Sequence, residues 1–150
     1  MPKILCSVST KGRYHTTLPL TIQAIINQIR PVDKLIVFDD NDNPEDMRNV
    51  LQYKHFFMML DIKRIPWEWV FAEKKGQHHN HQKANLMGYD WVWRVDDDAI
   101  PEPNVLENLS KHIADDVGAI GGSILTPPLT FDSSKVTGFI ENIDLSLIHI

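Results

Sequence analysis

The sequence predicts an α/β protein built on a mostly parallel sheet with helices on both faces. Apolar runs of strand length alternate with helical patterns, in the order β-α-β-α-β-α-β-α-β. Most of these runs are continuously apolar, which is typical of strands buried on both faces of a parallel sheet. Polar clusters directly follow three of the strands. In such a Rossmann-like sheet, ligands bind at the carboxyl ends of the strands.

The first strand and the first helix are expected near the N-terminus. The apolar run KILCSVS predicts a strand over residues 3–9, which a polar loop with one glycine follows. The segment LPLTIQAIINQI predicts a helix over 18–29, because its apolar side chains repeat at helical spacing. Thr17 is the expected cap of this helix, Pro19 fits its first turn, and Pro31 ends it.

The middle of the chain predicts two more strands and two more helices. KLIVF predicts a strand over 34–38, and a helix is expected to begin near Pro44 with acidic residues in its first turn. WEWVFA predicts a strand over 67–72, the one strand whose side chains alternate. QHHNHQKANLMG predicts a polar helix over 77–88 that ends at a glycine.

The last third of the chain completes the alternating pattern. DWVWRV predicts a strand over 90–95, which leads directly into three consecutive aspartates. EPNVLENLSKHI predicts a helix over 102–113, because its apolar residues recur every fourth position. VGAIGGSIL predicts a fifth strand over 117–125. We find no repeat and no linker, so residues 1–150 are expected to form a single domain.

Charge and hydropathy exclude several classes of partner. The net charge is −5 and no run of lysine or arginine occurs, which argues against nucleic acid and against an anionic membrane surface. No apolar stretch reaches the ~20 residues of a membrane span, and the N-terminus lacks a signal peptide. We therefore expect a cytoplasmic location, or the cytoplasmic part of a membrane-associated enzyme. The single cysteine, Cys6, is expected to be a small buried core residue.

The aspartate triplet is the main candidate site. Adjacent carboxylates such as Asp96, Asp97 and Asp98 raise one another's pKa and weaken a fold unless a cation neutralises them. Hard oxygen ligands select Mg²⁺ or Mn²⁺, and Mg²⁺ often completes its shell with substrate phosphates. The alternative is a solvated acidic turn that caps the next helix. The triplet alone leaves both interpretations open.

A second pair of carboxylates follows the second strand. Asp39 and Asp40 indicate either a turn that caps the next helix or a carboxylate that binds the base or ribose of a nucleotide. Neither a GxGxxG motif nor a P-loop is present, so a metal on the aspartate triplet is expected to hold the phosphates.

The histidine-rich segment HHNH lies at the start of the helix predicted over 77–88. His78 and His81 could share a helix face, but no further ligand follows at zinc spacing. The preferred interpretation is a polar helix N-terminus near bound phosphate, with Lys83 supplying positive charge. Arg94, within the strand that carries the aspartates, is expected to pair with the acidic loop.

Four stretches then occur in a specific order and spacing: ILCSVSTKGR, LIVFDDND, GQHHNHQKAN and WRVDDDAIPEPNVLENL. Together they resemble the nucleotide-binding half of family 2 glycosyltransferases with the GT-A fold, over about residues 3–125. In that family a Ser-Thr-like loop follows the first strand and two aspartates follow the second. An Asp-x-Asp motif and a proline-led helix follow the fourth. One Asp-x-Asp is weak evidence, but four motifs in register are strong evidence.

The resemblance implies a role for each matching residue. Ser9 and Thr10 would line the pocket for the nucleotide base, with Arg13 close by. Asp40, with Asp39 as the second candidate, would bind the base, which is expected to be uracil.

The resemblance also implies roles for the later motifs. Asp98 would be the principal ligand of Mn²⁺ or Mg²⁺, joined by Asp96, and Asp96 or Asp97 would face the ribose and the sugar. Lys83 lies where the family has a helix that contacts the nucleotide. The sequence departs from the family there, because HHNHQKAN replaces the usual Ala-Arg-Asn helix start.

The implied reaction is metal-dependent transfer of a sugar, expected to come from a UDP-sugar, to a hydroxyl of a glycan, lipid or protein acceptor. The family typically inverts the anomeric centre and uses a carboxylate as general base. That base lies well downstream of Asp-x-Asp in the family, so we expect it beyond residue 150 and expect this chain to be incomplete. The late carboxylates lie in no family motif: Asp132, Glu141 and Asp144.

Two other interpretations come from different classes of protein. A nucleotide-binding module without catalysis would show no turnover with any acceptor. A phosphoacceptor receiver-type domain also carries aspartates at strand ends, but it does not explain DDDAIPEP after the fourth strand.

Overall fold

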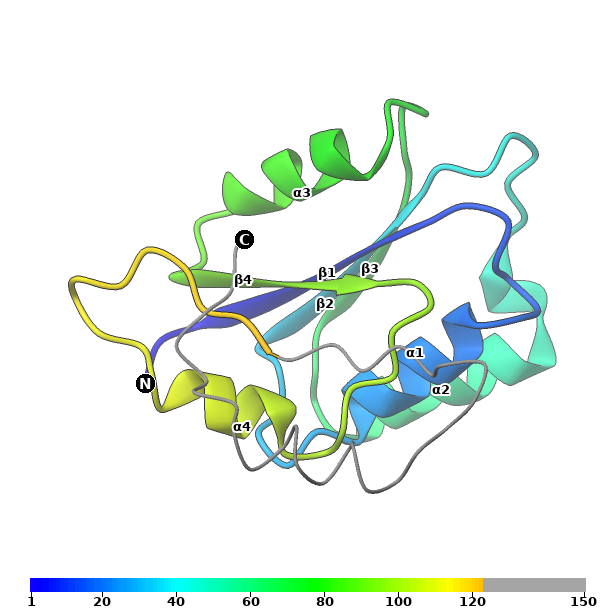
Figure 1. Cartoon of the computed structure of the whole chain (residues 1–150). Coiled ribbons are helices and arrows are strands. Elements are labelled where there is room, and N and C mark those ends of the chain that lie inside the picture. The colour runs from blue at the N-terminus through cyan, green and yellow to red at the C-terminus, as the bar shows by residue number, and fades with distance from the viewer. Residues whose placement is uncertain (123–150) are drawn as a thin grey trace, which may run out of the picture. The chain divides into compact units, whose positions relative to one another are not determined.

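The computed structural model describes residues 1–122 (Figure 1). The chain divides into two compact units, Met1–Leu106 and Glu107–Ile150, and we describe each by itself. The first unit holds the sheet and the helices on its faces. The described part of the second unit contains the end of one short helix and a series of turns. Within residues 1–122, no helix is long and apolar enough to cross a membrane.

The core of the first unit is a sheet of four parallel strands in the order β3-β2-β1-β4. The strands are β1 (Ile4–Thr10), β2 (Lys34–Asp39), β3 (Trp67–Phe71) and β4 (Trp91–Asp96). All four agree with the strands predicted from the apolar runs. The parallel arrangement follows from the helical crossovers between them, and it brings the carboxyl ends of β1, β2 and β4 to one edge.

Helices cover both faces of this sheet, as predicted. The helices of the first unit are α1 (Leu18–Ile26), the 3₁₀ helix η1 (Met47–Asn49), α2 (Leu51–Ile62) and α3 (Gln77–Asn85). A further short helix, α4 (Val105–Ser110), begins at the end of the first unit and lies mostly in the second. Figure 1 shows α3 on one face, and α1 with α2 on the other. The fold is therefore α/β with the mostly parallel sheet that the sequence predicts.

The two faces of the sheet bury alternate residues of the same strands, because successive side chains of a strand point in opposite directions. Leu5, Ile36 and Phe38 form a buried cluster with Ala84 of α3. Their neighbours in the strands face the α1–α2 side and include Cys6, which is fully buried as predicted. Burial raises the pKa of this thiol. Continuous burial of this kind explains why β1 and β2 read as unbroken apolar runs.

The helices predicted over 18–29 and 77–88 end three residues early, at Ile26 and Asn85, and three other elements differ more. The helix expected near Pro44 begins at Leu51, because Asp46 accepts a hydrogen bond from Arg48 N and starts the 3₁₀ helix instead. The helix predicted over 102–113 covers only Val105–Ser110. The predicted strand over 117–125 is wrong for residues 117–122, which contain three glycines and form no strand. Glycine has no side chain to pack and loses much entropy in a strand. Residues 123–125 lie outside the described part.

Candidate functional site

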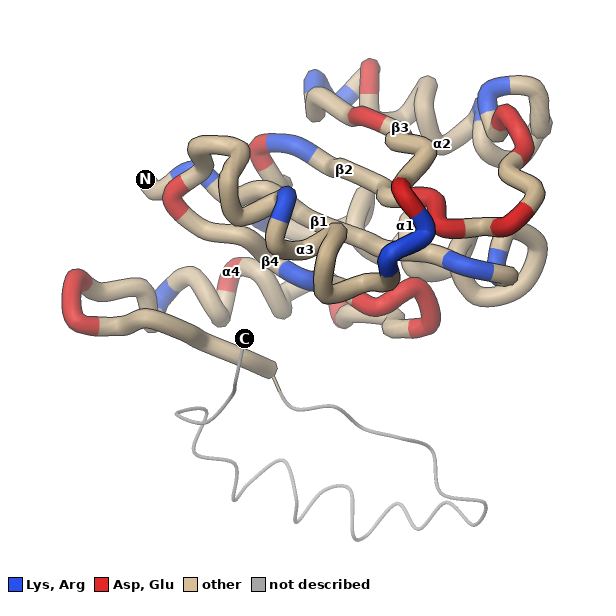
Figure 2. The backbone as a smooth tube through the Cα atoms, turned by 90° about the horizontal axis from the view of Figure 1, so that it is seen from above, with Lys and Arg blue, Asp and Glu red and all other residues tan. Residues whose placement is uncertain are grey.

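The carboxyl edge of the sheet brings together the three polar clusters that the sequence predicts. Thr10 lies opposite Asp39 in the β1–β2 register, and Ser9 lies opposite Asp96 in the β1–β4 register. Charged residues of both signs line the loops at this edge (Figure 2). The convergence confirms the expectation that was drawn from strand order alone.

Asp39 is buried and its carboxylate is fully engaged by the protein. Its Oδ2 accepts hydrogen bonds from the Tyr14 hydroxyl and, at 3.1 Å, from Trp69 Nε1. Its Oδ1 accepts from the backbone N of Asn41 at 3.0 Å and from Asn41 Nδ2 at 2.8 Å. A carboxylate has about four acceptor positions, so none is left for a ligand. Burial, and then the contact with Asp39, raise the pKa of Tyr14, which keeps this phenol protonated as a donor.

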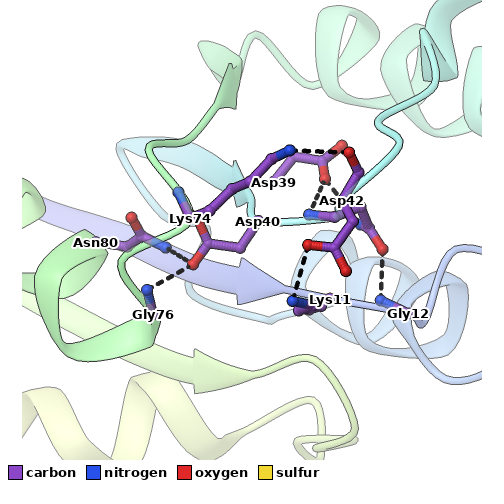
Figure 3. A network of polar contacts seen from close by, with 9 residues as sticks. Lys11, Gly12, Asp39, Asp40, Asp42, Lys74, Gly76 and Asn80 are labelled. Atoms are coloured by element: carbon purple, nitrogen blue, oxygen red, sulfur yellow. Dashed lines mark hydrogen bonds and ion pairs between the residues drawn. The ribbon is translucent and has the colours of Figure 1, made fainter.

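Asp40 is also buried, but its contacts differ from those of Asp39 (Figure 3). Its Oδ1 accepts from Lys74 N at 3.0 Å, and its Oδ2 accepts from Gly76 N at 3.0 Å and Asn80 Nδ2 at 2.9 Å. These three bonds leave about one acceptor position free on Oδ1. Gly76 precedes α3 with φ +88°, a conformation that glycine adopts without strain. Asp40 therefore ties the end of β2 to the N-terminus of α3.

Asn80 is a central residue of the site that the sequence analysis missed. It is fully buried, and Nδ2 donates both to Asp40 Oδ2 and, at 2.8 Å, to Ser9 Oγ. One amide thus joins β1, β2 and α3. Its Oδ1 is buried and has no hydrogen-bond partner within residues 1–122. The signal in the sequence was the asparagine of HHNH, at the start of a helix that follows the carboxyl edge of the sheet.

His81 belongs to α3, and its side chain points from the helix toward the sheet, away from solvent. Its Nδ1 is 2.9 Å from Ser7 Oγ. Burial lowers the pKa of His81 to about 4, with smaller contributions from the charges of Arg94 and His78. The ring is therefore neutral at pH 7 and belongs to the packing of α3 on the sheet.

Arg94 corrects another expectation from the sequence. It makes no ion pair with the acidic loop within the described residues, and its buried Nε has no hydrogen-bond partner there. The reason is strand alternation: Arg94 lies opposite Ser7 in the β1–β4 register and so faces the same side of the sheet.

The aspartate triplet forms a turn that starts at the end of β4. Ala99 N donates to the carbonyl of Asp96 at 3.0 Å and closes this turn. Asp97 Oδ2 accepts from Thr10 Oγ1 at 2.8 Å, which fixes Asp97 to the end of β1. Asp98 is exposed, and its Oδ2 lies 3.8 Å from Arg13 Nη2. Such a long and exposed ion pair contributes little to stability and is readily exchanged.

The turn carries three carboxylates, and within the described residues only Asp98 has an ion-pair partner, Arg13. Partial burial, followed by the charges of Asp98 and Asp97, raises the pKa of Asp96. Within residues 1–122, no group of three or more His, Cys, Asp or Glu side chains could hold a metal ion by itself. The partly desolvated Asp96 and the exposed Asp98 nevertheless fit an ion such as Mg²⁺ that takes one or two carboxylates and completes its shell with phosphates.

The basic side chains near this edge are already engaged. Lys83 forms an ion pair with Glu73, which also contacts Lys75 Nζ at 2.6 Å. The hydrogen bonds from Lys75 and Lys83 lower the pKa of Glu73 to about 2. Lys11 Nζ lies 3.1 Å from Asp42 Oδ1 (Figure 3). Lys83 is thus held at a glutamate of the β3–α3 loop, a contact that the sequence analysis did not predict.

Comparisons with known proteins agree with this geometry. The family model "Glycosyl transferase family 2" matches residues 8–139. No curated protein sequence matches the chain. A similar solved structure is the mannosyltransferase PcManGT from Pyrobaculum calidifontis in complex with GDP-Man and Mn²⁺. The two share 21% identity with a TM-score of 0.57, and the match covers 77% of this chain and 33% of that chain.

TarS from S. aureus is also similar in structure. The TM-score is 0.51 at 15% identity, and the match covers 73% of this chain and 19% of that chain. A structure of TarS 1–349 gives a TM-score of 0.52 at 15% identity, covering 73% of this chain and 31% of that chain. This chain therefore spans about a third or less of the length of these structures. At such identities the likeness shows the fold.

Proposed function

The chain belongs to glycosyl transferase family 2 and has the GT-A fold, and from this premise we propose that it forms the donor-binding part of a glycosyltransferase. The proposed reaction transfers a sugar from a nucleoside diphosphate to an acceptor hydroxyl, with inversion at the anomeric carbon. The observation that carries this proposal is the hydrogen bond from Thr10 to Asp97, which brings the end of β1 against the aspartate turn. Nucleotides bind at this edge of an open α/β sheet.

We assign different roles to the two aspartates that follow β2. Asp40 keeps one acceptor position on Oδ1, which supports a hydrogen bond to an N–H group of the base. Asp39 has no position left, so we propose that it acts by shaping the loop around Asn41. Ser9 accepts from Asn80, which leaves its own hydroxyl proton for a ligand. Ser9 and Thr10 are the proposed walls of the base pocket.

The aspartate turn is the proposed site for the diphosphate and for Mn²⁺ or Mg²⁺. Asp98 and Asp96 would hold the ion together with the phosphates, while Asp96 or Asp97 would face the ribose and the sugar. The ion, when bound, neutralises charge on the leaving diphosphate. The weak pair between Arg13 and Asp98 supports this assignment, because Asp98 can exchange its partner and free the guanidinium for a phosphate.

Lys83 stays a proposed contact of the nucleotide. Its ammonium would have to leave Glu73 to reach a phosphate, so the proposal requires the ion pair to open on binding. Both side chains are about half exposed, and a pair of this kind costs little to break.

Two nucleotides are candidates for the donor. The sequence favours UDP, and the structural relative that holds GDP-Man and Mn²⁺ makes GDP the second nucleotide to test. We assign no general base within residues 1–122, and Asp132, Glu141 and Asp144 lie outside the described residues. A glycan, lipid or protein is the proposed acceptor, and the cytoplasm stays the predicted location.

Calorimetric titration of UDP and GDP into the chain, with Mn²⁺ and with EDTA, tests the donor site. We expect one nucleotide to bind with Mn²⁺ and not with EDTA. If neither binds to a chain that is folded by circular dichroism, the proposed donor site is wrong. The alternative is a nucleotide-binding module without catalysis. Release of the nucleoside diphosphate from a bound nucleotide sugar in the presence of an acceptor would exclude it.

A further inference from the structure

Helix α1 is fastened to the segment that follows the aspartate turn. Thr21, which is fully buried in α1, donates from Oγ1 to the carbonyl of Ala99 at 2.8 Å. Ala99 directly follows Asp98. The contact therefore lies one residue beyond the proposed principal ligand of the metal.

A second buried side chain fastens the same segment farther along. Gln28 lies just past the end of α1, and its Nε2 donates to the carbonyl of Glu102 at 2.8 Å. Its Oε1 accepts from Leu106 N at 3.0 Å. The backbone adds one more contact, because Ile29 N donates to the carbonyl of Pro103 at 2.8 Å. The path of the chain after the turn is thus set by α1.

Both ends of the aspartate turn are fixed by different elements. At its start, Asp96 is paired with Ser9 of β1 in the sheet. At its end, the two polar backbone groups of Ala99 are both used: N–H bonds to Asp96 and C=O bonds to Thr21. Asp98 lies between these two anchors, and within residues 1–122 its own side chain has only the long contact with Arg13.

We propose that Thr21 is a positioning residue for Asp98 and so for the metal-dependent binding of the nucleotide diphosphate. The inference rests on the proposed function, because it concerns the same turn. Without the Thr21 hydroxyl, the Ala99 carbonyl loses its partner, and the peptide between Ala99 and Ile100 can rotate toward water. That rotation would loosen the end of the turn next to Asp98. Residues that orient a metal ligand typically change affinity by about 10–100-fold when they are replaced.

The test compares three threonine variants of this chain. Thr21→Val removes the hydroxyl and keeps the shape, and Thr21→Ser keeps the hydroxyl. Thr17→Val is the matched control, because Thr17 precedes the same helix and its buried Oγ1 has no hydrogen-bond partner within residues 1–122. Each variant is titrated with UDP and GDP in Mn²⁺, well below its melting temperature.

We expect Thr21→Val to weaken Mn²⁺-dependent binding about tenfold. Thr21→Ser and Thr17→Val should stay within about twofold of the parent chain, since neither removes an observed hydrogen bond to the turn. A merely structural role for Thr21 would lower the melting temperature of Thr21→Val and leave its affinity unchanged. That result overturns the inference and leaves the proposed function intact.

A second measurement does not depend on a bound nucleotide. Amide hydrogen exchange of Ala99 in the metal-free protein reports opening of the turn that its N–H closes. Faster exchange in Thr21→Val than in Thr17→Val is the expected result, and equal rates contradict the inference. If the parent chain binds neither nucleotide, the proposed donor site fails, and exchange at Ala99 still decides whether Thr21 holds the turn.

Discussion

Asn80 Nδ2 donates a hydrogen bond of 2.9 Å to Asp40 Oδ2 and so joins the N-terminal half of α3 to the end of β2. Both side chains are buried, so the bond is formed away from water. Hydrogen bonds to a charged acceptor are shorter and about twice as strong as neutral ones. The amide is therefore a specific requirement of this position, because it supplies a donor without adding a charge.

Replacing Asn80 by aspartate tests this requirement. Asn80→Asp places a second carboxylate against Asp40, and Asp40 loses one of its three donors. We expect the free energy of unfolding at pH 7 to fall by about 2–4 kcal/mol, measured by urea denaturation. Asn85→Asp, an exposed position at the end of the same helix, makes the same chemical change and should cost about 0.5 kcal/mol at most. Equal losses in the two variants would contradict the proposed role of Asn80.

Removing the Asp98 carboxylate should abolish nucleotide binding without lowering the stability of the fold. A raised pKa means that the folded protein holds the Asp96 proton more tightly than the unfolded chain, so this charge opposes folding at neutral pH. Asp98→Asn removes part of the repulsion. We expect the free energy of unfolding in EDTA to be unchanged or to rise by up to about 0.5 kcal/mol. Mn²⁺-dependent nucleotide binding should be lost.

Calorimetry and thermal unfolding measure these two effects on the same sample. Asp115→Asn is the matched control, because it removes one charge from an exposed aspartate of the second unit. This control should bind nucleotide like the parent chain. Retained binding by a folded Asp98→Asn protein would remove Asp98 from the proposed metal site.

The packing of α2 on β3 depends on an aromatic stack. The rings of Phe57 and Trp67 lie 4.0 Å apart between centroids and are nearly parallel, at 9°. Phe57 is only 8% exposed, so Phe57→Ala should lower the free energy of unfolding by about 3–4 kcal/mol in urea denaturation. Met58 is the next residue of α2 and is 50% exposed, so Met58→Ala should cost less than about 1 kcal/mol. A smaller loss for Phe57→Ala than for Met58→Ala would show that the stack contributes little.

Local patterns predicted the strands because all four are rich in apolar residues, and β1 and β2, which are buried on both faces, read as unbroken apolar runs. Strand order and parallel direction were then enough to predict that Ser9, Asp40 and Asp96 lie at one edge of the sheet. The partners of buried polar groups could not be predicted in this way. Asn80 bonds to residues 71 and 40 positions away in the chain, and only tertiary packing determines which side chains meet.

The charged residues were harder to predict for a related reason. Arg94 was assigned to the acidic loop from its position in the sequence, whereas it lies on the face of Ser7. The contact of Lys83 with Glu73 was not predicted from the sequence either. The direction of a long side chain depends on strand alternation and on nearby loops. The predicted strand was wrong for residues 117–122, because glycines in this run offer no side chains that pack against a sheet.

The buried His81 ring predicts how stability changes with pH. Its pKa is about 4 in the folded protein, below the ordinary value of 6.5 that applies to the unfolded chain. Between these values the unfolded chain binds a proton and the folded protein does not, so acid favours unfolding. The contribution of His81 is therefore complete above about pH 6.5 and decreases as the pH falls toward 4, by up to about 3 kcal/mol. Below about pH 4 both states are protonated and the decrease stops.

Urea denaturation of the parent chain and of His81→Gln, from pH 7 to pH 4, isolates this contribution from that of other titrating groups. The difference in unfolding free energy between the two proteins should shrink steadily over this range, because glutamine does not titrate. Ser7→Ala is the control: it removes the 2.9 Å contact but keeps the ring buried against Arg94, so it should retain most of the pH dependence. A difference between parent and His81→Gln that stays constant from pH 7 to pH 4 would show that the ring is protonated equally in both states. The assignment of a neutral, buried imidazole to His81 would then be wrong.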